Sequence, residues 1–214
     1  MLARRALLSV LITPLAFAAG ENTFRVRGSV HPGVVPFEIV VHAESIEDNG
    51  FSAIRAIEIT SAGKPVQSIR YPDDKPIVPV ISAAVSLTDV NCDGFKDLLV
   101  QSEVNVHGDA WYHLYLYEPS KGIFVLYPGF SKLPFQRVDC QSKIVKTHLN
   151  SGAAGCIYED ADYRWSGKRL IPIRIESQMS SDEAMETFTR TVERWHAGKR
   201  TITKKTVSAE NCHA

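Results

Sequence analysis

Short apolar stretches recur along most of the chain, and most are bounded by Gly, Pro, Asn or Asp. They alternate apolar with polar residues or are continuously apolar, and this pattern predicts strands at 37–43, 51–60, 83–90, 97–104, 112–118, 122–126, 143–149, 154–163 and 170–178. Turn signals about 8–12 residues apart are typical of sandwiches, barrels and propeller-like sheets. No Pro/Ser-rich linker or charge block divides the chain. We therefore expect an all-β single domain of antiparallel sheets, either a sandwich or a partial β-propeller.

The segment 182–198 fits two structures. Its apolar residues recur at helical spacing after an acidic start: Met185, Phe188, Val192 and Trp195. Its threonines alternate as in a strand, and a turn at 196–199 leads into a further alternating run. A helix and a hairpin both stay open here, with the hairpin preferred.

The N-terminus has the features of a signal peptide. Arg4 and Arg5 precede an apolar run over 6–17, and small residues at Ala16 and Ala18 mark a cleavage site. The run is shorter than the roughly 20 apolar residues of a membrane anchor, and Pro14 interrupts it. We expect a signal peptide at 1–18 and an exported, periplasmic or secreted domain at 19–214.

Charge and composition exclude two classes of protein. The chain has 24 basic and 24 acidic residues, and loss of the signal peptide would leave 22 basic residues and a net charge of −2. Dedicated nucleic-acid binders usually carry a basic excess, which is missing here. The hydrophobic fraction of 44% is that of a folded protein and excludes a disordered chain.

Export changes the interpretation of the four cysteines, Cys92, Cys140, Cys156 and Cys212. An even number in an oxidising compartment favours disulfides. Cys140 and Cys156 form the best local pair because each borders a predicted strand and glycines lie between them. We predict a Cys140–Cys156 bridge, and leave open whether Cys92 pairs with Cys212. No cysteine or histidine pair has the spacing of a zinc site.

One motif carries recognisable chemistry. Residues 89–97 match the calcium loop D-x-[DN]-x-D-G-x-x-D. Calcium takes six to eight oxygen ligands, and alternate residues of a tight loop converge on one ion. The predicted ligands are the side chains of Asp89, Asn91, Asp93 and Asp97 and the carbonyl of Phe95.

The flanks of this loop distinguish it from an EF-hand. An EF-hand has a bidentate glutamate at the twelfth position, where this chain has Val100. Both flanks are strand-like, so the motif predicts a strand–loop–strand calcium site. The alternative is a metal-free turn around Asp93 and Gly94, in which three neighbouring carboxylates would repel one another.

The loop resembles the calcium loops of FG-GAP (integrin-type) propeller blades. Together with the following W-Y-H-L-Y-L-Y-E-P segment at 111–119, it also resembles a family of bacterial periplasmic proteins. Some members of that family are immunity proteins, which inhibit peptidoglycan hydrolases delivered by type IV secretion. The resemblance implies a partial β-propeller with bound calcium. Glu118 departs from the family's Asn or Asp, and the lipid-anchor cysteine of some relatives is missing.

Two classes of function follow. The first is a non-catalytic, calcium-stabilised binding protein, specifically an inhibitor of a cell-wall hydrolase, with the loop 105–109 as the partner-contacting edge. The second is a periplasmic hydrolase that uses the carboxylates of Glu159, Asp160 and Asp162. The first is preferred because the sequence contains no recognisable nucleophile–base pair.

Overall fold

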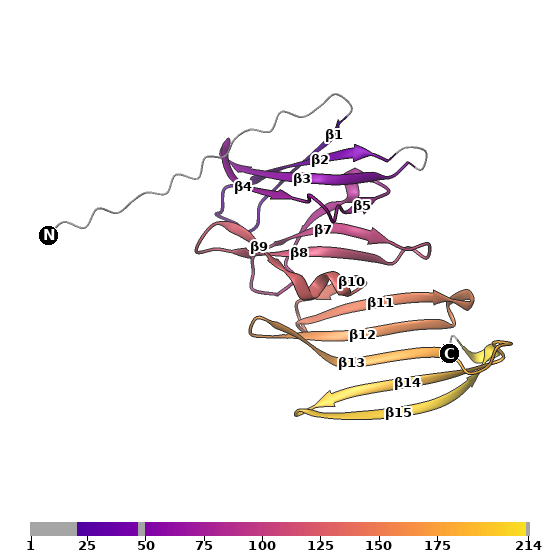
Figure 1. Ribbon diagram of the computed structural model, residues 1–214. Helices are drawn as coiled ribbons and strands as arrows, with labels where there is room; N and C mark the ends of the chain where they lie inside the picture. Colours follow the sequence, from indigo (N-terminus) through magenta and orange to yellow (C-terminus); the bar gives the residue numbers. More distant parts are fainter. Residues whose placement is uncertain (1–20, 47–49, 213–214) are drawn as a thin grey trace.

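The computed structural model describes residues 21–46 and 50–212, and this part of the chain folds into three antiparallel sheets (Figure 1). Sheet 1 has the order β1-β2-β3-β4, with β5 paired to β3; its strands are β1 (Glu21–Gly28), β2 (Phe37–Ser45), β3 (Ser52–Ser61), β4 (Lys64–Arg70) and β5 (Ile77–Val78). Sheet 2 contains β6 (Val85–Thr88), β7 (Asp97–Val104), β8 (Ala110–Glu118) and β9 (Ile123–Tyr127) in sequence order.

Sheet 3 continues the succession in sequence order. Its strands are β10 (Phe135–Asp139), β11 (Ile144–Gly152), β12 (Ile157–Ser166), β13 (Arg169–Ser180), β14 (Thr187–His196) and β15 (Lys199–Ser208). The only helical segments in the described residues are four short 3-10 turns, Ile81–Ala83, Pro128–Lys132, Ala153–Gly155 and Ala209–Asn211. The all-β prediction is confirmed, and the three sheets form a sandwich-like single domain.

Sheet 2 is the middle layer and is covered on both faces. In β7, Leu98 and Val100 belong to the larger core shared with sheet 1, whereas Leu99 packs into the core shared with sheet 3. Successive residues of a strand point to opposite faces, so a continuous apolar run is what a doubly covered strand requires. On the sheet 1 side, the Phe37 ring lies 5.5 Å from the Phe124 ring, measured between centroids.

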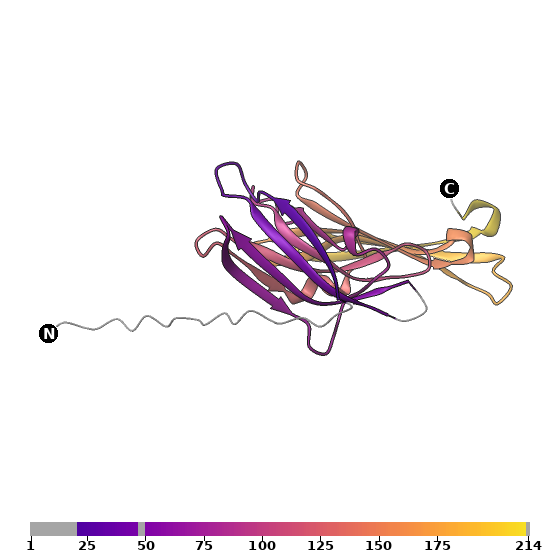
Figure 2. The same ribbon diagram turned by 90° about the horizontal axis from the view of Figure 1, so that it is seen from above.

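Sheet 3 loses its cover toward the C-terminus. Val145 of β11 is fully buried against sheet 2, but nine of the ten residues of β15 are exposed. Seen from above, the last strands extend past sheet 1 (Figure 2). A small cluster of Cys156, Phe188 and Cys212 closes one end of this region.

The ambiguous segment 182–198 is a hairpin strand, as preferred from its alternating threonines. β14 and β15 pair in register from Thr187↔Ser208 to His196↔Lys199. The two turn residues, Ala197 and Gly198, have φ of 49° and 77°, which is the positive-φ geometry of a tight two-residue hairpin. The strands β1, β4, β5 and β10 were not predicted.

The predicted Cys140–Cys156 bridge is wrong. Cys92 pairs with Cys140 and Cys156 pairs with Cys212, with Cα–Cα distances of 5.3 and 5.4 Å. Cys140 precedes the nine-residue strand β11 and Cys156 follows it, so the strand holds the two residues roughly 25–30 Å apart. Most of the residues between them form one extended strand, so the chain does not fold back to bring the two cysteines together.

We predict that the double substitution Cys92→Ser/Cys140→Ser destabilises the protein. This bridge spans 48 residues, and the chain-entropy model gives about 4 kcal/mol for a loop of that length. Urea unfolding of the variant and the parent protein measures the loss. Non-reducing peptide mapping is the control, and recovery of a peptide linking Cys140 to Cys156 would contradict the observed pairing.

Candidate functional site

The motif 89–97 lies between two paired strands, as the sequence predicted. It connects β6 to β7, and Thr88 and Asp97 pair across its base. Gly94 has φ of 92°, a conformation that glycine adopts without strain.

The polar side chains of this loop bind its own backbone. Asp89 accepts hydrogen bonds from the N–H groups of Asp93 at 3.2 Å and Gly94 at 2.9 Å. Asn91 Oδ1 also accepts from the Asp93 N–H, and Asp93 Oδ1 accepts from the Phe95 N–H at 2.9 Å. The structure therefore brings Asp89, Asn91 and Asp93 together in one turn.

Asp97 is placed differently from the other predicted ligands. Its side chain is completely buried, with one oxygen 2.9 Å from the Val90 N–H and the other 2.9 Å from the Tyr117 N–H in β8. Burial raises the pKa of this carboxyl to about 7, although the amide donors act in the opposite direction. Asp97 thus anchors the loop to β8 of the middle sheet through its buried carboxylate.

The loop also contacts the two outer sheets. The Lys96 N–H donates to the Val30 carbonyl at 2.8 Å in the connection between β1 and β2. On the other side, Trp165 Nε1 of β12 donates to the Val90 carbonyl at 2.8 Å, and Cys92 is bridged to Cys140 beside β10. One loop therefore ties all three sheets together.

The loop carries oxygen atoms of the kind that calcium binds in proteins. Asp89, Asn91 and Asp93 supply hard carboxylate and amide oxygens from alternate positions of one turn. Both oxygens of Asp97 already accept amide hydrogen bonds. The Phe95 ring packs away from the turn, 4.8 Å from the His31 ring and 5.7 Å from the Tyr117 ring. Within 21–46 and 50–212, no three His, Cys, Asp or Glu side chains form a group that could hold a metal ion.

A hollow of about 500 Å³ lies beside the loop. Leu116, Val125, Leu126 and Trp165 line it, and Asp93 borders it from the loop. Val125 and Leu126 are 43% and 47% exposed. This hollow provides apolar contact surface next to the turn.

The loop between β7 and β8, residues 105–109, projects into solvent and is internally braced. Val106 is 96% exposed. Asn105 Oδ1 accepts hydrogen bonds from the N–H groups of His107 and Asp109, each at 2.9 Å. Asp109 Oδ2 accepts from the Asn150 N–H of β11 at 2.8 Å, which fixes the loop to sheet 3. Asp109 is thus a structural brace of the loop.

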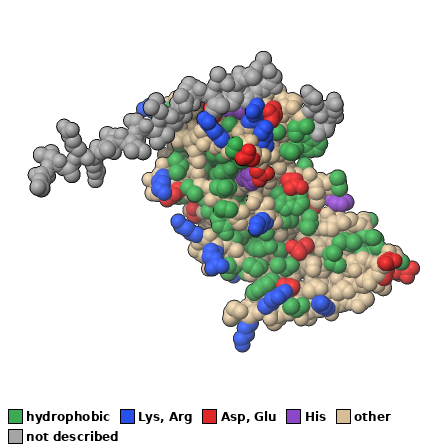
Figure 3. All heavy atoms as spheres, viewed as in Figure 1, with side chains coloured by type: hydrophobic (Ala, Val, Ile, Leu, Met, Phe, Trp, Pro, Cys, Tyr) green, Lys and Arg blue, Asp and Glu red, His purple; other side chains and the backbone are tan. Residues whose placement is uncertain are grey.

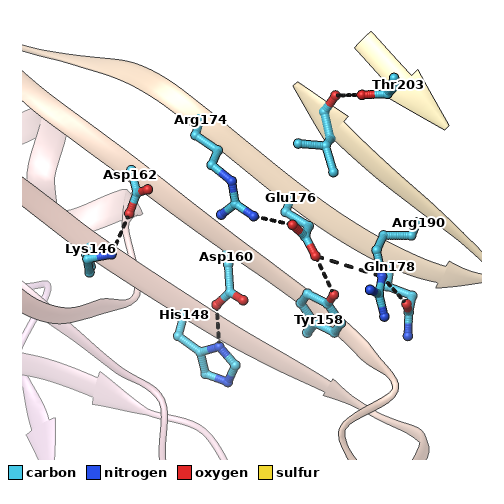
Figure 4. Close-up of polar contacts among 11 residues, drawn as sticks. Lys146, His148, Tyr158, Asp160, Asp162, Arg174, Glu176, Gln178, Arg190 and Thr203 are labelled. Carbon is cyan, nitrogen blue, oxygen red and sulfur yellow. Dashed lines mark hydrogen bonds and ion pairs between the residues drawn. The ribbon is translucent and has the colours of Figure 1, made fainter. Parts of the chain in front are cut away.

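The carboxylates of Glu159, Asp160 and Asp162 do not form one cluster. Asp160 pairs with His148 Nδ1 at 2.7 Å, and Asp162 pairs with Lys146 Nζ at 3.3 Å (Figure 4). Glu159 lies on the opposite face of β12, because successive strand residues alternate. The sequence had grouped them by proximity along the chain.

A polar network on sheet 3 was not predicted. Tyr158 Oη donates to Glu176 at 2.8 Å, and Glu176 also contacts Arg174 (Figure 4). Burial, and after it the bond to Glu176, raises the pKa of Tyr158 to about 12. The alternation of Arg174, Glu176 and Gln178 along β13 was the signal available in the sequence.

Gln178 secures the C-terminal end of this network. It is completely buried, and its Nε2 donates to the carbonyls of Cys156 at 2.8 Å and Cys212 at 3.1 Å. Arg190 Nε donates to Gln178 Oε1 at 2.8 Å. These bonds attach the main chain at both cysteines of the second disulfide to Gln178 in β13, and Arg190 in β14 supports Gln178.

Comparison with solved structures shows a fold relationship. A structure described as a Xanthomonas type IV secretion system related protein matches with a TM-score of 0.59 and 18% sequence identity, over 86% of this chain and 100% of that chain. No family model matches the chain, and no curated protein matches its sequence. In the described part of the chain, no helix is long and apolar enough to cross a membrane.

We predict that Asp97→Ala costs about 3 kcal/mol of unfolding free energy, since it leaves the amides of Val90 and Tyr117 buried without an acceptor. Chemical denaturation in excess chelator measures the loss independently of any cation. Asp93→Ala, at an exposed position, is the control and should cost much less. Equal losses for the two variants would show that Asp97 is not the anchor of the loop.

Proposed function

We propose that this protein is an exported, non-catalytic binding protein that contacts another periplasmic protein, specifically a cell-wall hydrolase that it inhibits. The braced, projecting loop 105–109 is the observation that carries the proposal. The structural neighbour is described as a type IV secretion system related protein, which agrees with such a role. Two disulfides and the predicted signal peptide agree with an oxidising compartment.

The loop has the physical properties of a contact element. Its tip exposes Val106, an apolar side chain that gains by leaving water. Its shape is held by Asn105 inside the loop and by Asp109 on β11. A preformed loop loses little conformational entropy on docking, so more of the contact energy appears as affinity.

We infer that calcium stabilises this scaffold. Asp89, Asn91 and Asp93 would hold the ion together with the Phe95 carbonyl, and Asp97 would support the loop from the buried side. The cation would supply charge neutralisation for carboxylates that otherwise repel one another. Because the same loop contacts all three sheets, a stabilised loop stabilises the whole sandwich.

Calcium binding predicts a change in melting temperature. An ion that binds only the folded state adds about 2.7 kcal/mol when its concentration is a hundredfold above the dissociation constant. The melting temperature measured by calorimetry should fall on addition of chelator and recover with calcium. Asp93→Ala should abolish this response. An unchanged melting curve in chelator would favour the metal-free turn.

The contact role of the loop predicts that Val106→Asp weakens binding to a cell-wall hydrolase encoded beside this protein. We expect a loss of about tenfold or more in affinity by calorimetry, because a central apolar contact is replaced by a charge. Val35→Asp is the matched control, since Val35 is 54% exposed in the connection between β1 and β2. If no such hydrolase binds the parent protein, or if both variants weaken binding equally, the loop is not the contact.

A further inference from the structure

The hairpin formed by β14 and β15 has a charge opposite to that of the rest of the chain. Residues 187–208 carry six of the 24 basic residues and one of the 24 acidic residues, so their net charge is +5 against −5 for all other residues. Lys and Arg side chains lie along the lower margin of the face shown in Figure 3, where these strands end. The neutral total charge of the protein conceals this asymmetry.

Two lysines near the middle of β15 have no opposite charge within ion-pair distance among the described residues. Arg200 pairs with Glu193 at 2.6 Å and stacks on Trp195 at 5.7 Å. No ion pair of the described part of the chain includes Lys204 or Lys205, and both are exposed. Their charge is available to a partner.

β15 is also an open sheet edge. It is the terminal strand of sheet 3, and β14 is its neighbour on one side only. In a two-residue hairpin the pair next to the turn, here His196 and Lys199, exchanges hydrogen bonds. Lys199 and every second residue from it therefore bond to β14, and the residues between them turn their N–H and C=O groups outward. The outward main-chain groups in the middle of the edge belong to Ile202 and Lys204.

We propose that the edge of β15 accepts an acidic, extended polypeptide segment, which adds to sheet 3 as a further strand. The main-chain groups of the edge supply the hydrogen bonds of strand addition, and Lys204 and Lys205 supply the charge complementarity. The surface is separate from the loop 105–109 and does not depend on the function proposed for that loop.

The charge pattern selects this occupant over two others. A second copy of this chain would bring its own lysines against Lys204 and Lys205, and like charges in facing strands are destabilising. A flat anionic membrane would require the charges on one face. Lys204 and Lys205 are successive strand residues and point to opposite faces, so the positive charge surrounds the edge.

The test uses a fluorescein-labelled peptide of alternating Glu and Val, matched to the ten residues of β15, and the full mature protein. Fluorescence anisotropy should show binding that weakens as salt is added. The same peptide with alternate N-methylated residues keeps its charge but loses main-chain donors, and its affinity should be about tenfold lower or worse.

Two variants of the protein test the two components separately. Lys204→Glu/Lys205→Glu should reduce affinity about tenfold or more and flatten the salt dependence. Ile202→Pro removes an outward N–H from an edge strand, where proline is tolerated, and should weaken binding without changing the salt dependence. Lys64→Glu/Lys132→Glu, at exposed lysines outside sheet 3, is the matched control and should bind the peptide as the parent does.

Three results would overturn the proposal. The first is an N-methylated peptide that binds as well as the unmodified one, which would reduce the interaction to general charge attraction. The second is binding of phosphatidylglycerol vesicles without binding of the peptide. The third is an equal loss in the control double variant. Because the comparison of the two peptides uses the unmodified protein, it stands even if Ile202→Pro fails to fold.

Discussion

The buried carboxylate of Asp97 is the constraint on which the rest of this structure depends. A carboxylate with no exposed surface is costly unless donors surround it, and here the donors are main-chain amides from the loop and from β8. Satisfying Asp97 therefore fixes the position of the loop 89–96 on the middle sheet. Once the loop is fixed, Lys96 and Val90 are in place to bind the two outer sheets.

This arrangement explains why the first disulfide is where it is. Cys92 lies in the loop, and Cys140 lies at the turn that precedes β11. The bridge therefore reinforces a junction that hydrogen bonds already define, and it joins sheets 2 and 3 where Trp165 also reaches the loop. The second disulfide does the same at the far end, where buried Gln178 binds the carbonyls of both cysteines.

The strands of the middle layer could be predicted from sequence because burial controls their pattern. Leu98, Leu99 and Val100 form an apolar run that only a doubly covered strand would contain. The motif from Asp89 to Asp97 was equally visible, since its residue types and spacing form a recognisable pattern within nine residues. The sequence could not show that Asp97 would bind amides from β8, because that contact joins residues twenty positions apart.

The remaining errors have the same physical origin. The pairing of Cys140 with Cys156, and the grouping of Glu159 with Asp160, both assumed that closeness in sequence means closeness in space. In a strand it means the reverse: nine residues of β11 separate the two cysteines along its length, and alternation places the two carboxylates on opposite faces. β15 could be expected only as the second strand of the preferred hairpin, because no layer covers it and burial leaves almost no pattern in its sequence.

The contrast between the covered and uncovered sheets indicates where binding surfaces form in such a scaffold. Sheet 2 is covered on both faces, so it contributes to the surface chiefly at its ends, and the loop 105–109 is one of those ends. β15, the last strand of sheet 3, has neither a covering layer nor a neighbour on its outer side, and both its faces and its edge meet solvent. An uncovered sheet gains little stability from burial and depends on its polar network and disulfide instead. Here the polar network and the disulfide keep the sheet ordered, and basic side chains lie at its open edge. An ordered edge with exposed main-chain groups can pair with a partner strand.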